Sequence, residues 1–125
     1  MRFNGVCLVT KDMPMLRAFY EAVLQVKAEG DDTFTQFATQ GAALSIFSEE
    51  GMEQMAPGSM QGSGCGRYTL EFAVEDVDRE HERLRSMDIP VVKPPTTQTW
   101  GRRSVWFRDP DGNIINFFAH VAPKI

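Results

Sequence analysis

Arg108-Asp-Pro-Asp-Gly-Asn-Ile-Ile-Asn-Phe117 is the stretch of this chain that decides its fold, because it joins two apolar runs through a tight turn. Pro110 presets φ for the first corner of the turn, and Gly112 can adopt the positive φ that such turns require. The pattern predicts an antiparallel hairpin with strands Arg103–Arg108 and Asn113–Val121.

Length and composition indicate one soluble domain. The chain has 125 residues, 42% of them hydrophobic, with a net charge of −4 and a pI near 5.1. These values predict a packed core and argue against nucleic acid or an anionic membrane as partner. No apolar run reaches the roughly 18 residues of a membrane helix, and the N-terminus lacks the pattern of a signal peptide. Only two cysteines are present, which favours a reduced, cytoplasmic protein.

The first half of the chain predicts a strand, a helix and further strands. Asp12 is a good helix N-cap and Pro14 falls in the first turn. The helix that follows carries an apolar stripe at helical spacing and ends near Gln25. The stripe is Leu16, Phe19, Tyr20, Val23 and Leu24. The predicted extended segments are Phe3–Val9, Val26–Glu29, Thr33–Ala38 and Ala42–Ser48.

The second half repeats this order. After an irregular segment, 49–66, with a turn of helix expected around Glu53–Met55, comes a strand, Tyr68–Val74. Asp76 caps a second helix whose inner side is Val77, His81, Leu84 and Met87. Ile89–Val92 is expected to be extended and to stop at Pro94-Pro95, before the hairpin.

Placing Asp12 on Asp76 superposes the two halves with an offset of 64 residues, strand on strand and helix on helix. An internal repeat of this kind predicts two βαβββ modules, at about 1–50 and 67–125, joined by a linker at about 51–66. The predicted fold class is α+β, a single domain over residues 1–125, with an eight-stranded open curved sheet, a cleft and helices packed outside.

Several motifs resemble the vicinal oxygen chelate superfamily, which contains glyoxalase I, extradiol dioxygenases and the bleomycin- and fosfomycin-resistance proteins. The matching stretches are Val9-Thr10-Lys11-Asp12-Met13 with Phe19-Tyr20-Glu21-Ala22-Val23-Leu24, then Phe72-Ala73-Val74-Glu75-Asp76-Val77-Asp78, Trp100-Gly101-Arg102-Arg103, and Phe107-Arg108-Asp109-Pro110-Asp111-Gly112-Asn113. Their order and spacing cover almost the whole chain. The resemblance implies the two-module fold and, commonly, a homodimer.

The resemblance also implies four metal-ligand positions, which correspond to Gly5, Ser45, Thr69 and Asn116 in this sequence. Family enzymes use a divalent metal there as a Lewis acid. A glycine offers no donor, and neutral hydroxyls or amides are poor ligands for a transition metal. We therefore expect neither the family's metal nor another cofactor, and catalytic residues cannot be assigned.

Strand alternation and the family pattern predict a ligand pocket with aromatic walls and one carboxylate. Its expected residues are Cys7, Ser45, Phe47, Thr69, Glu71, Trp100, Ser104, Trp106, Asn116 and Phe118. Glu71, His120 and Cys7 could also form a displaced acid–base or metal site. The simpler reading makes Glu71 a hydrogen-bonding carboxylate, His120 a rim residue and Cys7 a small buried side chain. Alternatively, Trp106, Phe47 and Phe118 fill a collapsed core.

Other candidate groups have structural explanations. Asp109 and Asp111 belong to the turn, and His81 is expected to be a half-buried packing residue. Arg102 and Arg103 are expected at a solvated strand start, where either could meet an anionic ligand.

Three functions remain open at this point. The first is metal-free binding of a small aromatic or apolar molecule, which the missing ligands favour over enzymatic activity. The second is a metal-dependent lyase, isomerase or dioxygenase of the glyoxalase type. The third is an interaction domain with a vestigial cleft. Fold alone does not decide among them.

Overall fold

The computed structural model describes residues 1–64 and 66–122. Cys65, one of the two cysteines considered above, lies outside the described residues. The chain divides into two compact units, Met1–Gly64 and Cys65–Ile125, and each is described by itself. The boundary between them falls within the linker expected at 51–66.

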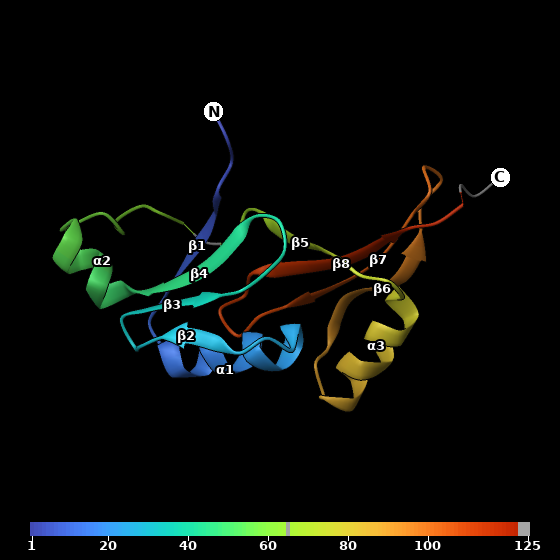
Figure 1. The fold of residues 1–125 in the computed structure, drawn as a ribbon, viewed down its shortest axis with the longest axis horizontal. Coiled ribbons are helices and arrows are strands. Elements are labelled where there is room, and N and C mark those ends of the chain that lie inside the picture. Colours follow the sequence, from blue (N-terminus) through green and yellow to red (C-terminus); the bar gives the residue numbers. More distant parts are fainter. Residues whose placement is uncertain (65, 123–125) are drawn as a thin grey trace. The chain divides into compact units, whose positions relative to one another are not determined.

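The first unit contains a four-stranded sheet with the order β1-β4-β3-β2. Its elements are β1 (Gly5–Thr10), α1 (Met13–Leu24), β2 (Ala28–Gly30), β3 (Phe34–Phe37), β4 (Ala43–Ser48) and α2 (Glu49–Met55). β1 pairs in parallel with β4, and the remaining neighbours are antiparallel. Figure 1 shows α1 along one side of this sheet and α2 continuing from the end of β4.

The second unit repeats the arrangement, with the strand order β5-β8-β7-β6. Its elements are β5 (Thr69–Ala73), α3 (Val77–Ser86), β6 (Val91–Thr97), β7 (Arg102–Arg108) and β8 (Ile114–His120). β5 pairs in parallel with β8, while β7 is antiparallel to both β6 and β8. The predicted α+β fold of two βαβββ modules is therefore confirmed, and its eight strands form two four-stranded sheets.

Both long helices begin where the sequence predicts, and α1 also ends there. The Asp12 carboxylate accepts a hydrogen bond from the Met15 N–H at 3.1 Å, and α1 ends before Gln25, which adopts left-handed backbone angles. Asp76 caps α3 in the same way, accepting from the Arg79 N–H at 3.1 Å. Such caps satisfy backbone donors that a helix leaves unpaired at its start.

α1 and α3 each pack an apolar stripe against one face of the sheet in their own unit. The side chains that form these two cores are nearly inaccessible: Leu8, Leu16, Tyr20, Val23, Phe37, Leu44 and Ile46 in the first unit, and Leu70, Val77, Leu84, Val105, Phe107, Ile115 and Phe117 in the second. His81 is half-buried on α3, as expected. Full burial of one such apolar side chain stabilises the fold by about 1.5–3 kcal/mol.

β6 differs from the prediction because it continues through Pro94 and Pro95 to Thr97. Proline cannot donate a hydrogen bond to a neighbouring strand, so it is tolerated mainly at sheet edges and bulges. β6 is an edge strand, and its pairing with β7 shifts register between Lys93 and Thr96, where both prolines lie. The expectation that Pro94-Pro95 ends the strand was therefore wrong.

α2 is longer than the single turn expected around Glu53–Met55. Ser48 caps it by accepting a hydrogen bond from the Gly51 N–H at 2.9 Å. Glu49 and Glu50 lie in its first turn, where carboxylates favour the positive end of the helix dipole. The helix follows β4 without an intervening loop.

The β7–β8 turn is organised around Asp109, which is only 4% exposed. Its carboxylate accepts hydrogen bonds from the N–H groups of Asp111 and Asn113, both at 2.9 Å, and from Asn113 Nδ2 at 2.8 Å. Gly112 has a φ of 91°, which only glycine adopts readily. The structural role predicted for Asp109 is confirmed, and the turn sets the register of β8 against β7.

Within the described residues, no helix is both long enough and apolar enough to cross a membrane.

Candidate functional site

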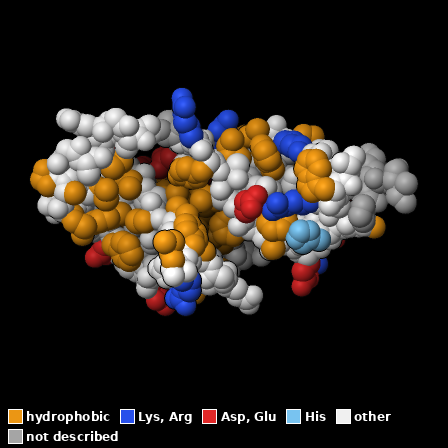
Figure 2. Space-filling view, turned by 90° about the horizontal axis from the view of Figure 1, so that it is seen from above, with side chains coloured by type: hydrophobic (Ala, Val, Ile, Leu, Met, Phe, Trp, Pro, Cys, Tyr) orange, Lys and Arg blue, Asp and Glu red, His pale blue; other side chains and the backbone are white. Residues whose placement is uncertain are grey.

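Two neighbouring rows on the face of the second unit's sheet away from α3 carry five of the ten side chains predicted for the pocket. β5, β8 and β7 place Glu71, Asn116 and Trp106 side by side in one row. The next row contains Ala73, Phe118 and Ser104. We call these two rows, together with Arg102 and Lys93, the open face. Figure 2 shows the side of the second unit away from α3, where charged side chains lie among hydrophobic ones.

Asn116 and Ser104 are the two buried polar residues of the open face, each with 5% exposure. Asn116 Nδ2 donates a hydrogen bond to Glu71 Oε2 at 3.3 Å, which turns the amide oxygen away from that carboxylate. Asn116 Oδ1 is buried and has no hydrogen-bond partner, and the same is true of Trp106 Nε1. Buried polar atoms are nearly always paired, so an unpaired acceptor and donor on neighbouring strands call for an explanation.

Arg102 lies across the open face. Its guanidinium carbon is 3.6 Å from the centre of the Phe118 ring, and its Nη2 is 3.3 Å from Glu71 Oε2. Arg102 Nε is buried and has no partner. Arg102 therefore stacks on one aromatic ring and reaches the carboxylate two rows away, with one of its donors unused.

A second cation stacks on the same face. Lys93 Nζ lies 5.1 Å from the centre of the Trp106 ring, and the two residues are direct neighbours across β6 and β7. Trp106 and Phe118 are both half-buried, unlike the core rings behind them. The open face thus combines two accessible aromatic rings, two cations and one carboxylate.

Three residues predicted for the pocket lie at different places in this unit. Ser104 is buried beside Phe118, as strand alternation predicts. Thr69 lies in the row of Ile114 and is exposed. Trp100 is in the loop before β7 and is 70% exposed, so it does not join the rows of the open face. His120, at the end of β8, is exposed, as expected of a rim residue.

The first unit contains the other three residues predicted for the pocket, which are Cys7, Ser45 and Phe47. Cys7 and Ser45 are direct neighbours across β1 and β4, and Phe47 lies in the next row between Val9 and Phe34. The Phe34 and Phe47 rings meet edge to face at 6.1 Å. Cys7 is a free, exposed thiol, so the expectation of a small buried side chain was wrong. Alternation places Leu8, not Cys7, in the core.

The four positions implied as metal ligands do not fit a metal. A Cβ added at Gly5 would lie 2.2 Å from the backbone oxygen of Ala43, so a side chain there requires the strands to move. Thr69 and Ser45 offer hydroxyl groups and Asn116 a neutral amide, all weak donors for a transition metal. No group of three or more His, Cys, Asp or Glu suited to a metal occurs among residues 1–64 and 66–122.

The strand register in the two sheets shows that Ser45 and Asn116 occupy equivalent positions in the two modules. Gly5 pairs with Ala43 and Cys7 with Ser45, while Thr69 pairs with Ile114 and Glu71 with Asn116. Ser45 and Asn116 therefore occupy the same place in the two modules. The carboxylate nearest Asn116 is that of Glu71, which corresponds to Cys7 in the first unit.

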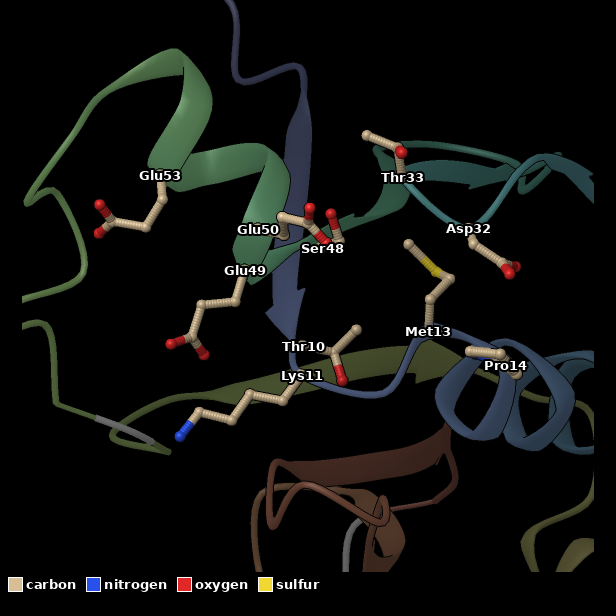
Figure 3. A pocket seen from close by; sticks show the side chains of 10 residues that line it. All are labelled: Thr10, Lys11, Met13, Pro14, Asp32, Thr33, Ser48, Glu49, Glu50 and Glu53. Carbon is tan, nitrogen blue, oxygen red and sulfur yellow. The ribbon is translucent and has the colours of Figure 1, made fainter.

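The first unit also has a separate hollow of about 650 Å³ that sequence reasoning missed. Its lining contains four carboxylate residues, Asp32, Glu49, Glu50 and Glu53, together with Lys11. Figure 3 shows Lys11 and Glu49 on one side of this hollow and Asp32 on the opposite side. Asp32 is already paired with Arg17 at 2.8 Å. The signal available in the sequence was the Glu49-Glu50 pair next to the Ser48 cap.

The two arginines that begin β7 are not simply solvated, as the sequence suggested. Arg102 lies on the open face, whereas Arg103 points to the α3 side and donates two hydrogen bonds to Asp78, at 2.9 and 2.7 Å. The bond from Arg103 holds the pKa of Asp78 below its ordinary value of 3.8. Strand alternation would have grouped Arg102 with Ser104 and Trp106.

Comparison with known proteins agrees with this architecture. Residues 2–117 match the family described as the Glyoxalase/Bleomycin resistance protein/Dioxygenase superfamily. The uncharacterized protein YraH of Bacillus subtilis is 26% identical and aligns over 94% of this chain and 98% of its own length. The fosfomycin resistance protein FosX of Listeria innocua is 25% identical, over 93% and 87% of the two chains.

Solved structures show the same fold. A glyoxalase/bleomycin resistance protein/dioxygenase family enzyme from Burkholderia phytofirmans superposes with a TM-score of 0.84 at 17% identity, over 97% of this chain and all (100%) of its own. A lactoylglutathione lyase from Agrobacterium tumefaciens superposes with a TM-score of 0.76 at 21% identity, over 94% and 92%.

Proposed function

Because the chain belongs to the Glyoxalase/Bleomycin resistance protein/Dioxygenase superfamily, we propose that it binds a small aromatic or apolar molecule, without a metal, on the open face of its second unit. The observation that carries this proposal is the pair of buried, unpartnered atoms Asn116 Oδ1 and Trp106 Nε1 beside half-buried aromatic rings. A ligand that hydrogen-bonds to one or both would offset the cost of leaving them unpaired, about 1–3 kcal/mol each.

The metal-free part of the proposal is supported by the donor chemistry of Gly5, Ser45, Thr69 and Asn116. Gly5 is the most restrictive of the four, because its strand has no room for a side chain. The names of two relatives, a fosfomycin resistance protein and a lactoylglutathione lyase, agree with a small organic molecule as ligand.

Two measurements test the proposal. Metal analysis of protein purified without chelator should find no stoichiometric Zn, Ni, Mn or Fe, and a stoichiometric metal would overturn the metal-free part. A thermal-shift screen of aromatic compounds, repeated with EDTA, should find ligands whose shifts survive the chelator. A screen in which no aromatic compound shifts the unfolding temperature would overturn binding on this face.

Variants of Trp106 and Phe118 locate the site. Trp106→Leu and Phe118→Leu should each weaken the binding of a ligand found in this screen by about fivefold, since stacking on an aromatic ring contributes about 1 kcal/mol. Trp100→Leu is the matched control, because Trp100 is exposed and lies outside the two rows of the open face. The homodimer and the cytoplasmic location expected from the sequence stay predictions; light scattering of the purified protein tests the dimer.

A further inference from the structure

The open face already holds a planar cation, and that cation belongs to the chain itself. The Arg102 guanidinium stacks 3.6 Å from the centre of the Phe118 ring and contacts Glu71 Oε2 at 3.3 Å. An aromatic face and a carboxylate are the two groups that best recognise a flat, delocalised cation. The contacts of Arg102 therefore indicate that this place can bind a flat, delocalised cation.

Arg102 fits this place incompletely. Its Nε is buried with no acceptor, and the neighbouring Asn116 Oδ1 is buried with no donor. Asn116 is only 5% exposed and is held in orientation by its own hydrogen bond to Glu71. A ligand with two N–H groups on one edge could donate to Glu71 and to Asn116 together, while a displaced Arg102 would regain hydrogen bonds to water.

We propose that the place formed by Glu71, Asn116 and Phe118 binds a planar organic cation such as an amidinium or guanidinium, and that Arg102 occupies it until the ligand displaces it. This inference rests on the proposed function and gives its ligand a chemical class. It also makes Arg102 a competitor of the ligand: a guanidinium tethered to the site acts at a high effective concentration, so removing it should strengthen binding.

The aromatic rings of the open face already accept cations. Lys93 lies over Trp106 in the adjacent position, so both aromatic rings of the open face carry a cation supplied by the chain. The whole chain has a net charge of −4, which favours the approach of positively charged molecules. Replacing Arg102 by an external cation keeps the balance of charge beside Glu71 unchanged.

The test uses benzamidine, a planar cation, and benzamide, its neutral isostere, measured by calorimetry on the full chain. Arg102→Ala should bind benzamidine about tenfold more tightly than the wild type, with little change for benzamide. Arg102→Met retains the contact with Phe118 without the charge and should give the same direction of change. Arg103→Ala is the matched control, since Arg103 pairs with Asp78 on the other face, and should leave both affinities unchanged.

A second substitution removes the carboxylate. Glu71→Gln in the Arg102→Ala background should abolish the preference for benzamidine over benzamide. In isotope-labelled protein, the Trp106 indole N–H resonance, next to Asn116, should shift on benzamidine addition, whereas that of Trp100 should not.

The outcomes separate this inference from the proposed function. An equal gain for benzamide, or no gain for benzamidine in either Arg102 variant, overturns the planar-cation class, while binding of a neutral aromatic such as 2-naphthol to the wild type keeps the proposed function. If neither 2-naphthol nor benzamidine binds to any variant, both fall together.

Discussion

Replacing Asp109 by alanine should destabilise the protein more than any other change in the β7–β8 turn. The Asp109 carboxylate accepts hydrogen bonds from two backbone N–H groups at 2.9 Å and from Asn113 Nδ2 at 2.8 Å. Hydrogen bonds to a charged group contribute about 1.5–3 kcal/mol each, and the donors of buried Asn113 would lose their acceptor. Water can accept the hydrogen bond of the exposed Asp111 N–H in place of the carboxylate. We therefore expect Asp109→Ala to lower the free energy of unfolding by about 2–4 kcal/mol.

Asp109→Asn separates the role of the acceptor from that of the charge. Its amide oxygen can still accept from the two backbone N–H groups, but its NH₂ group then faces Asn113 Nδ2, a second donor. We expect this variant to lose about half as much stability as Asp109→Ala. Asp111→Ala is the control, because the Asp111 side chain is exposed and the hydrogen bond uses its backbone N–H.

Urea unfolding followed by circular dichroism measures these free energies. A loss of 2–4 kcal/mol corresponds to a fall in unfolding temperature of about 6–16 °C for a chain of this size. The reasoning is refuted if Asp109→Ala costs less than about 1 kcal/mol, the value expected of one ordinary hydrogen bond, or if Asp111→Ala costs as much.

Three further changes test separate parts of the fold. Asp78→Asn should cost under about 1 kcal/mol at pH 7, because the pair with Arg103 is partly exposed, and the difference from the wild type should shrink as the pH falls. The direction follows from a folded-state pKa of Asp78 below 3.8, because the pair stabilises the fold above that pH and its contribution is lost as the pH falls through the folded-state pKa. Urea unfolding at pH 7 and pH 3 measures the difference in stability. A difference that stays constant between the two pH values would contradict this expectation. Gly5→Ala should lower the free energy of unfolding by about 1–3 kcal/mol, because the added Cβ meets the Ala43 backbone oxygen. Ser45→Ala is the nearby control, and an unchanged stability of Gly5→Ala would contradict the prediction. Ser48→Ala should remove the α2 cap and about 1 kcal/mol of local stability, seen as faster amide exchange in Glu49–Met55 and not in α1.

The sequence predicted the helices and the hairpin because local chemistry determines them. Asp12 and Asp76 each precede an apolar helical stripe, and each accepts a hydrogen bond from the backbone N–H three positions later in the chain. The same rule would have found α2, since Ser48 is followed by two glutamates. It was missed because Ser48 also ends β4, and a segment rich in Gly and Met shows no apolar period that marks a helix.

The remaining differences depend on neighbours that the sequence does not name. Pro94 and Pro95 stop a strand only where a partner needs their N–H groups, and the edge position of β6 removes that need. The exposure of Cys7 depends on which face of β1 meets α1. The path of Arg102 over Phe118 to Glu71 requires three strands in register, so alternation could place its Cα but not its contacts.

Asn116 connects the turn to the site. The Asp109 network sets the register of β8, and this register places Asn116 between Glu71 and Trp106. A carboxylate at position 116 would repel Glu71 next to it, since like charges directly opposite one another destabilise a sheet. An amide instead donates to Glu71, and its buried oxygen is left without a hydrogen-bond partner. The amide at position 116 and the carboxylate at position 71 are therefore consistent as a pair, and the pair suits recognition of an N–H-bearing ligand better than ligation of a metal.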